Sequence, residues 1–363
     1  MEELHVPGVA VAIVDRGGVA FSAGYGWADL ENRIPMTPDT VTNIASISKT
    51  FTNAAVLQLV EQGQLGLDDD VSQLLPFPVR HPEYPEVSIT VRQLLTHTSG
   101  IEDGDAYDES YACGDPTVSL ADWIRGYLVP GGEFYSAAQN FLPTAPGEAY
   151  SYSNVGFGLA GYLVEVASGM PFAEYVESNL FEPLGMTESG FYLSEFESGR
   201  QAVPYAWIDA GDALDNVLFG NRNGEKASEA GFIPFCPYSF YNIPDGLVRT
   251  SVDQLARFLV AHIRGGELDG RRILTESTVA EIFSPQLDPS LTREDESVRG
   301  LTWSRTESGI GELWGHNGAD PGIRSHMQFQ PESGRGVVVF ANRATIVTPI
   351  FERLLAEVAV AGR

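Results

Sequence analysis

The sequence predicts an α/β fold of the α+β type, in which one antiparallel sheet is built from both chain ends and flanked by helices. Strand-like runs occur near the start and again after residue 300, whereas residues 65–295 alternate short helical patterns with loops rich in Gly, Pro and aromatic residues. The turns between the strands are too short for crossover connections, so neighbouring strands must be antiparallel. We expect one domain, 1–363, with a sheet lobe (1–64 plus 296–363), an inserted mostly helical lobe (65–295) and a groove between them.

The first elements are a hairpin and a buried helix. Val6 to Asp15 and Val19 to Leu30 have strand composition and are joined by a Gly-Gly turn. Thr42 to Gln62 has helical composition and is followed by a glycine that suits a C-cap. Apolar residues cover most of the circumference of this helix, so we expect it to be buried on all sides, although it opens with two serines and a lysine.

The remaining elements follow from local periodicity. Six helices are expected in the inserted lobe, at Thr90 to Leu95, Ser119 to Tyr127, Val155 to Ser168, Phe172 to Leu180, Ser251 to Ile263 and Glu276 to Ile282. Near the C-terminus we expect four strands and one helix, at Leu301 to Thr306, Gly311 to Gly315, Arg324 to Gln330, Gly336 to Asn342 and, for the helix, Pro349 to Val360.

The charge of the chain excludes one class of partner. It carries 49 acidic and 22 basic residues, a formal net charge of −27. No run of basic residues interrupts this acidity, so a nucleic-acid partner is not expected. Because 43% of the residues are hydrophobic and 10% aromatic, the charge does not indicate disorder.

Lysine is scarce in this chain. Only Lys49 and Lys226 occur beside twenty arginines, where about twenty lysines would be ordinary. An arginine-biased or salt-adapted proteome accounts for the general pattern. A lysine that persists against this bias is a candidate for proton transfer, which arginine cannot perform near neutral pH.

Cysteine content and the chain start give limited information. Cys113 and Cys236 form either one bridge or two buried free thiols, and they cannot form a zinc site of the C-x-x-C type. No apolar stretch is long enough for a transmembrane helix, and the start has no leader pattern. The chain enters its first strand after about six residues. The sequence therefore leaves two localisations open, export with removal of a leader and the cytoplasm.

Ser46 and Lys49 form an S-x-x-K pattern at the start of the predicted helix. Three residues of helical spacing place the hydroxyl and the amine on one face, so the lysine could deprotonate the serine. Desolvation and the positive end of the helix dipole would both lower the pKa of Lys49. The pattern is short enough to occur by chance, and a surface lysine after an N-cap serine would produce it too.

Two further motifs decide between these interpretations. Tyr152-Ser153-Asn154 precedes a predicted helix, and His316-Asn317-Gly318 follows a predicted strand. In this order and context, S-x-x-K, Tyr-x-Asn and His-x-Gly resemble the three motifs of the serine β-lactamase and penicillin-binding-protein superfamily. The chain is most similar to the branch of class C β-lactamases, D-alanyl-D-alanine peptidases, D-aminopeptidases and esterases. Weaker markers agree, among them LLTHTSGI, LFEPLGM and GHNGADPG.

The resemblance implies a β-lactamase/transpeptidase-like fold and a role for each motif residue. Ser46 would attack a carbonyl, with Lys49 and Tyr152 as the pair that removes and later returns the proton. Asn154 would hold the lysine and the acyl side-chain amide, and His316 of the third motif would be the fourth catalytic residue. The backbone N–H groups of Ser46 and Ala319 would form the oxyanion hole, and Asn317 and Gly318 would contact substrate. No cofactor is implied.

His316 departs from the family pattern. It replaces a lysine whose permanent charge faces the substrate carboxylate in penicillin-recognising members, and histidine is only partly charged at neutral pH. We therefore expect a serine hydrolase that forms an acyl-enzyme on a small ester, amide or peptide, of the esterase or D-amino-acid amidase or peptidase type. The alternatives are a β-lactamase or D,D-carboxypeptidase, an acyl transferase or peptide cyclase, and a non-catalytic ligand-binding scaffold. The oligomeric state is left open.

The other histidines and the acidic runs do not indicate a metal site. The six histidines form neither an H-x-x-x-H pair nor H-E-x-x-H, so no metal is expected. We expect His97 to stabilise its loop and Asp68 to Asp70 to form a turn and an N-cap. Tyr152 is chosen over Tyr150 because only Tyr152 has an asparagine two positions later.

Overall fold

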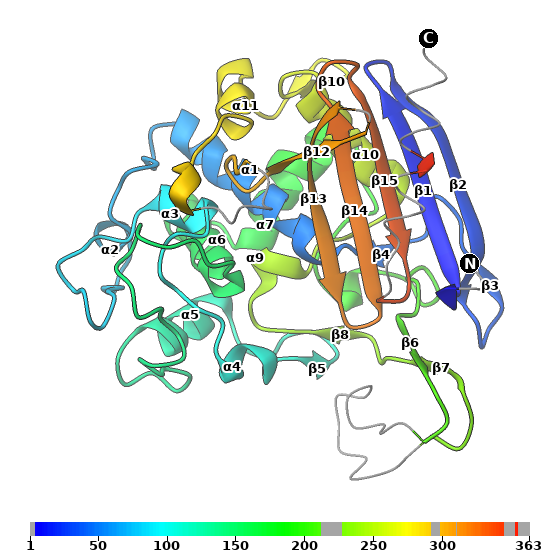
Figure 1. Ribbon diagram of the computed structural model, residues 1–363, viewed down its shortest axis with the longest axis horizontal. Coiled ribbons are helices and arrows are strands. Elements are labelled where there is room, and N and C mark those ends of the chain that lie inside the picture. Colours follow the sequence, from blue (N-terminus) through cyan, green and yellow to red (C-terminus); the bar gives the residue numbers. More distant parts are fainter. Residues whose placement is uncertain (1–3, 212–226, 292–297, 310, 345–352, 355–363) are drawn as a thin grey trace.

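A seven-stranded antiparallel sheet joins the two ends of the chain (Figure 1). The computed structural model describes residues 4–211, 227–291, 298–309, 311–344 and 353–354. The strand order is β12-β13-β14-β15-β1-β2-β3. The bounds are β1 (Gly8–Asp15), β2 (Gly18–Asp29), β3 (Ile34–Pro35), β12 (Ser304–Ser308), β13 (Gly311–Asp320), β14 (Ile323–Gln330) and β15 (Arg335–Ala341).

The predicted fold class is confirmed by the pairing of β1 with β15. Val9 lies opposite Ala341, and Val14 lies opposite Gly336, so the first strand pairs directly with the last described one. This pairing closes a sheet from segments more than 300 residues apart, as the alternating runs at the two ends predicted.

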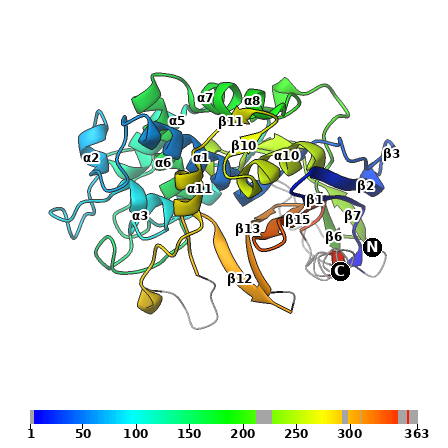
Figure 2. The ribbon, with the colours of Figure 1, turned by 90° about the horizontal axis from the view of Figure 1, so that it is seen from above.

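Helices cover one face of the sheet. They are α1 (Ser48–Glu61), α2 (Val71–Leu74), α3 (Val91–Leu95), α4 (Asp105–Asp108), α5 (Leu120–Leu128), α6 (Asn154–Ser168), α7 (Phe172–Val176), α8 (Glu182–Leu184), α9 (Ile243–Gly246), α10 (Val252–Ile263) and α11 (Glu276–Ile282). A π-helical segment, Glu177–Phe181, links α7 to α8. Figure 2 shows α10 beside β1 and β15, which it contacts.

Within the described ranges, four two-stranded ladders lie outside the main sheet. They pair β4 (Thr42–Asn43) with β9 (Arg249–Thr250), β5 (Ala112–Cys113) with β8 (Tyr238–Ser239), β6 (Tyr205–Ile208) with β7 (Gly231–Pro234), and β10 (Glu267–Leu268) with β11 (Arg271–Arg272). Short 3-10 turns are η2 (Ala45–Ile47), η4 (Leu193–Glu195) and η5 (Pro289–Leu291).

Helix boundaries follow the sequence signals, with one important exception. The side chains of Thr90, Ser119 and Ser251 cap α3, α5 and α10 as the helix patterns predicted. The predicted helix from Thr42 instead begins at Ser48. The preceding residues form β4 and η2, because Thr42–Asn43 pairs with β9 and Ala45 has a φ of 49°, which an α-helix cannot contain.

Three C-terminal predictions differ from the structure or lie outside it. The strand expected at Leu301 to Thr306 is observed at Ser304–Ser308, because its pairing with β13 begins at Ser304 opposite Gly315. The strand expected to end at Gly315 continues to Asp320, because its pairing with β14 continues to Asp320 opposite Ile323. Of the helix expected at Pro349 to Val360, only residues 353 and 354 are described, and both are helical. The rest of that helix and Lys226 lie outside the described residues.

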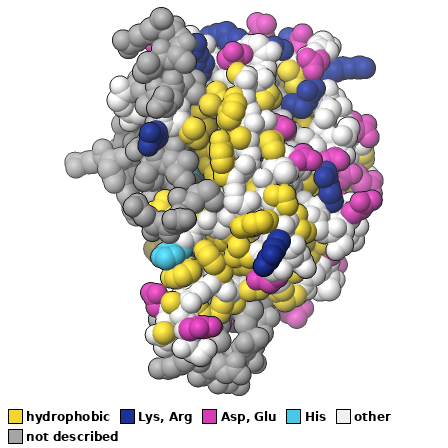
Figure 3. All heavy atoms as spheres, turned by 90° about the vertical axis from the view of Figure 1, so that its right-hand side faces the viewer, with side chains coloured by type: hydrophobic (Ala, Val, Ile, Leu, Met, Phe, Trp, Pro, Cys, Tyr) yellow, Lys and Arg dark blue, Asp and Glu magenta, His cyan; other side chains and the backbone are white. Residues whose placement is uncertain are grey.

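The sheet face turned away from the helices carries both buried and exposed apolar residues. Val9, Val11, Val337 and Val339 are buried there in one cluster. On neighbouring β2, the side chains of Phe21, Tyr25 and Trp27 are 41–50% exposed. Figure 3 shows hydrophobic side chains gathering on this side of the molecule.

Among the described residues, no single helix has the length and apolar character needed to cross a membrane. The pair formed by α6 and Phe172–Leu184 passes the same criterion only when taken together, and it is bent by 77° at its break.

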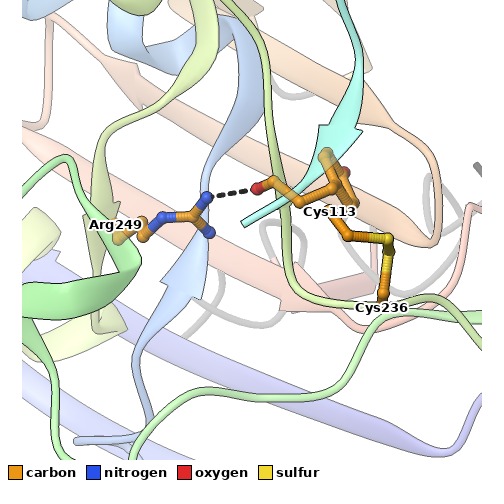
Figure 4. The surroundings of a disulfide bond; sticks show 4 residues. Cys113, Cys236 and Arg249 are labelled. Atoms are coloured by element: carbon orange, nitrogen blue, oxygen red, sulfur yellow. Dashed lines mark hydrogen bonds between the residues drawn. A yellow bond between two sulfur atoms is a disulfide. The ribbon is translucent and has the colours of Figure 1, made fainter. Parts of the chain in front are cut away.

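Cys113 and Cys236 form a disulfide, which settles the alternative that the sequence left open. The bridge joins β5 to the segment before β8 and lies close to Arg249 (Figure 4). It spans 123 residues of chain, so in the loop-closure model it restricts the unfolded state strongly.

Reduction of this disulfide is expected to lower the free energy of unfolding by about 2–5 kcal/mol. Urea unfolding with and without reductant measures the change. The double variant Cys113→Ser/Cys236→Ser is the control. Its urea midpoint should match that of the reduced wild type and should not change when reductant is added. An unchanged midpoint of the reduced wild type would contradict this expectation.

Candidate active site

Ser46 lies in η2, one turn before Lys49 in α1. Ala45 directly before it adopts a left-handed backbone conformation, and its N–H donates to Asn43 Oδ1 at 2.6 Å. A non-glycine residue in this conformation is strained, and such strain is often found at functional sites. The turn fixes the direction in which the Ser46 side chain leaves the backbone.

Lys49 is fully buried and uses its ammonium group in three hydrogen bonds. Nζ donates to Ser46 Oγ at 3.0 Å, to Asn154 Oδ1 at 2.6 Å and to the carbonyl of Asp245 at 3.0 Å. It also forms an ion pair with Asp245 Oδ2 at 3.5 Å. Three residues of the predicted site therefore meet at one atom. The predicted burial of the helix is confirmed, since every residue from Ser48 to Leu59 is buried.

The prediction of a lowered pKa for Lys49 is wrong in direction. Burial does lower the pKa of Lys49, but attraction to the Tyr152 oxygen and to the carboxylates of Asp245 and Asp103 outweighs burial and raises it above its usual value. Burial raises the pKa of Asp245 to about 6, and the nearby Lys49 opposes that rise. At neutral pH the structure therefore holds a lysine cation against an ionised aspartate.

Tyr152 and Asn154 are placed by the N-terminus of α6. The Ser153 hydroxyl caps the helix by accepting from the N–H of Gly156 at 2.9 Å. Asn154 is the first helical residue, and Tyr152 lies just outside the helix, with its side chain 37% exposed. Lys49 Nζ is 4.9 Å from the centroid of the Tyr152 ring. The phenol thus borders both Lys49 and solvent.

Tyr150 lies elsewhere. Its ring faces Arg299, whose guanidinium carbon is 4.9 Å from the ring centroid. The ring of Tyr150 also lies 5.9 Å from that of His97, whereas Tyr152 is the tyrosine whose ring faces the Lys49 ammonium.

His97 supports the Tyr152 loop. Its ring stacks on Tyr152 at 4.2 Å between centroids, and its Nδ1 accepts from the N–H of Ser153 at 3.0 Å. Burial lowers the pKa of His97 well below its usual value, so the ring is neutral. This geometry agrees with the loop-stabilising role predicted for it.

His316 lies in β13 and faces Tyr152, with 6.5 Å between ring centroids. Its side chain is buried, and Nδ1 is 2.8 Å from the carbonyl oxygen of Asn317, so Nδ1 carries the proton. Burial lowers the pKa of His316 to about 3, and the Lys49 cation adds to the effect. His316 is therefore neutral at physiological pH, which removes the positive charge that a lysine would supply at this position.

Gly318 lets β13 approach the nucleophile turn closely. A Cβ at this position would lie 2.3 Å from the carbonyl oxygen of Ile44 and 3.1 Å from the Ala45 Cβ. The same carbonyl accepts from Ser325 Oγ of β14 at 2.7 Å. The sheet and the turn are thus held together where Ala319 follows Gly318, while Asn317 points outward as an exposed residue.

The comparison with protein families agrees with this geometry. The family model described as Beta-lactamase matches residues 1–359. The chain belongs to the beta-lactamase family.

Relatives of this beta-lactamase-family chain include proteins of known structure. Protein flp of Staphylococcus aureus (strain MRSA252) is 30% identical over 342 residues, which cover 94% of this chain and 60% of that protein. The chain thus spans about 60% of the length of the curated relatives it matches. The penicillin-binding protein from Bacillus halodurans has a TM-score of 0.73 at 26% identity, covering 98% of this chain and 97% of that one.

The D-amino acid amidase from Ochrobactrum anthropi SV3, complexed with L-phenylalanine amide, has a TM-score of 0.68 at 25% identity. The match covers 93% of this chain and 86% of the amidase. Family and neighbours confirm the predicted superfamily and support a serine hydrolase in general.

Sequence reasoning missed two carboxylates in this beta-lactamase-family site, the buried Asp245 and the partly buried Asp103. Asp245 accepts hydrogen bonds from Tyr107 at 2.9 Å and Asn242 at 2.7 Å, besides its contact with Lys49. Asp103 accepts from the N–H groups of Asn154 and Val155 at 2.9–3.0 Å and so anchors the start of α6. The available signal was Lys49 itself, because a lysine in a fully buried helix requires an anionic partner.

Proposed function

We propose that this protein is a serine hydrolase that forms an acyl-enzyme at Ser46 on an ester or amide, of the esterase or D-amino-acid amidase or peptidase type. The observation that carries the proposal is the 3.0 Å contact between Ser46 Oγ and the buried Lys49 ammonium. A hydroxyl held by a buried cation is poised to lose its proton.

Tyr152 is the proposed proton acceptor. Lys49 is held as a cation 4.9 Å from the Tyr152 ring centroid, so its charge stabilises negative charge on the Tyr152 oxygen during proton transfer. Ser46 Oγ attacks the carbonyl carbon as its proton passes to the Tyr152 oxygen. Tyr152 then gives this proton to the departing alkoxide or amine, and a water repeats the sequence to release the acid.

The N–H groups of Ser46 and Ala319 are the proposed oxyanion donors. The close approach of Gly318 to Ile44 and Ala45 supports this assignment, because it places the strand that carries Ala319 next to the turn that carries Ser46. The two donors would stabilise the negative charge that develops on the carbonyl oxygen.

The neutral state of His316 supports neutral or cationic acyl substrates over anionic ones. A ligand carboxylate beside His316 would find no positive charge on this ring, and its approach would also be opposed by the net charge of −27. The similarity to a D-amino acid amidase agrees with this substrate class.

A small substrate panel tests the proposed class. We expect p-nitrophenyl acyl esters or D-amino acid amides to have a higher kcat/KM than a chromogenic cephalosporin, because the cephalosporin carboxylate lacks a cationic partner at His316. The rates are corrected with Ser46→Ala, which keeps the fold and removes the nucleophile. A cephalosporin kcat/KM above those of both other classes would refute the proposed class.

A further inference from the structure

Asp320 is a carboxylate beside the proposed oxyanion position. It is the last residue of β13 and directly follows Ala319. The Asn43 side chain links it to the nucleophile turn, since Nδ2 donates to Asp320 Oδ2 at 3.3 Å and Oδ1 accepts from the N–H of Ala45 at 2.6 Å. One side chain thus bridges Asp320 to the residue before Ser46.

The alternation of β13 places Asp320 on the same face as His316. Side chains alternate along a strand, so His316, Gly318 and Asp320 share one face while Asn317 and Ala319 share the other. His316 faces Tyr152. Asp320 therefore belongs to the site wall and lies at the opposite end from His316, about 13 Å along the strand at about 3.3 Å per residue.

Among the described residues, the Asp320 carboxylate has neutral hydrogen-bond partners and no cation within ion-pair distance, although the charge of Arg249 acts on it from farther away. Tyr111 donates to Oδ1 at 2.8 Å, and Tyr238 and Asn43 donate to Oδ2 at 2.9 and 3.3 Å. None of the ion pairs between described residues includes Asp320. An ionised carboxylate offers about four acceptor positions, so Oδ1 keeps one of its two for a further donor.

The nearest buried guanidinium is used elsewhere. Arg249 donates to the carbonyl of Tyr238 at 2.6 Å and to that of Phe191 at 3.3 Å. Burial raises the pKa of Asp320 to about 7, as expected for a negative charge that lacks a contacting counter-ion, although its side chain is only partly buried. A cationic ligand bound at the open lone pair of Oδ1 would stabilise the ionised form of Asp320.

We propose that Asp320 binds the protonated amino group of the acyl part of the substrate, so that the site selects aminoacyl esters and amides over acyl groups without an amine. The selection rests on the proposed function. A carbonyl bound at the N–H of Ala319 would have its α-substituents next to the following residue of the strand. The disulfide holds the loops that carry Tyr111 and Tyr238, and both tyrosines fix the Asp320 carboxylate.

Two anilides that differ only in the amine test this proposal. D-alanine p-nitroanilide and propanoyl p-nitroanilide are compared at neutral pH with wild type, Asp320→Asn and Asp70→Asn. Asp70 is the matched control, because it also accepts several hydrogen bonds but caps α2 and pairs with Arg80. We expect wild type and Asp70→Asn to prefer the amino substrate. In Asp320→Asn the ratio of kcat/KM values should fall about 10- to 100-fold, the range for a lost hydrogen bond between charged groups, mainly through KM.

Two outcomes overturn the proposal while the proposed hydrolase stands. One is a wild type that hydrolyses both anilides without preference, which requires no variant to fold. The other is an equal loss on both substrates in Asp320→Asn, which would make Asp320 a positioning residue for β13. A wild type no faster than Ser46→Ala on esters as well as on both anilides would refute the hydrolase itself, and the Asp320 proposal with it.

Discussion

Ser46→Ala should abolish acyl-enzyme formation and lower kcat by about 10⁶-fold, the loss seen when a serine nucleophile is removed. Ser46 Oγ is the hydroxyl that contacts the buried Lys49 ammonium, at 3.0 Å. Neither Lys49 nor Tyr152 can replace it as a nucleophile in the proposed mechanism, because both are assigned to the proton. Intact-mass measurement after treatment with a fluorophosphonate, together with ester hydrolysis, reads out both effects.

Ser48→Ala is the matched control for this experiment. Ser48 directly precedes Lys49 in sequence but is buried, and its Oγ accepts from the N–H of Val248 at 3.0 Å. Removal of the Ser48 hydroxyl should lower the free energy of unfolding by about 1–3 kcal/mol, because the buried N–H of Val248 loses its acceptor. The fluorophosphonate adduct at Ser46 should still form in this variant. An adduct that persists in Ser46→Ala, or hydrolysis at the wild-type rate, would refute Ser46 as the nucleophile.

The local part of the site could be predicted from the sequence, and the distant part could not. Ser46 and Lys49 are three residues apart, so helical geometry alone predicts their contact. The Lys49–Asp245 pair joins residues 196 apart, and no periodicity signals such a contact. Desolvation was expected to dominate the pKa of Lys49, and the predicted direction was wrong, because the attraction to Tyr152 was not weighed and the attraction to Asp245 could not be seen in the sequence.

The fold shows the same division. Alternation and turn residues predicted the strands at both chain ends, since those signals are local. The predicted end of β13 at Gly315 was too early, because Gly315 and Gly318 weaken the strand pattern while cross-strand pairing with β14 maintains the strand to Asp320. The disulfide partners could be named from the sequence, but their pairing depended on loops 123 residues apart.

Removal of Lys49 should affect catalysis and stability by separate physical effects. Lys49→Met is expected to lower kcat about 10²- to 10⁴-fold, because the proton transfer between Ser46 and Tyr152 loses its neighbouring cation. It should also reduce the free energy of unfolding by about 3–5 kcal/mol, because Asp245 is left as an uncompensated buried charge. Steady-state kinetics and urea unfolding measure the two effects independently.

The double variant Lys49→Met/Asp245→Asn separates them. Asn at position 245 can keep partners in Tyr107 and Asn242 without a charge, so most of the lost stability should return when the pair is replaced as a unit. Activity should stay low, because no cation remains next to Ser46 and Tyr152. If kcat recovers together with stability, Lys49 acts only by neutralising Asp245, and its assignment to the catalytic proton transfer is wrong.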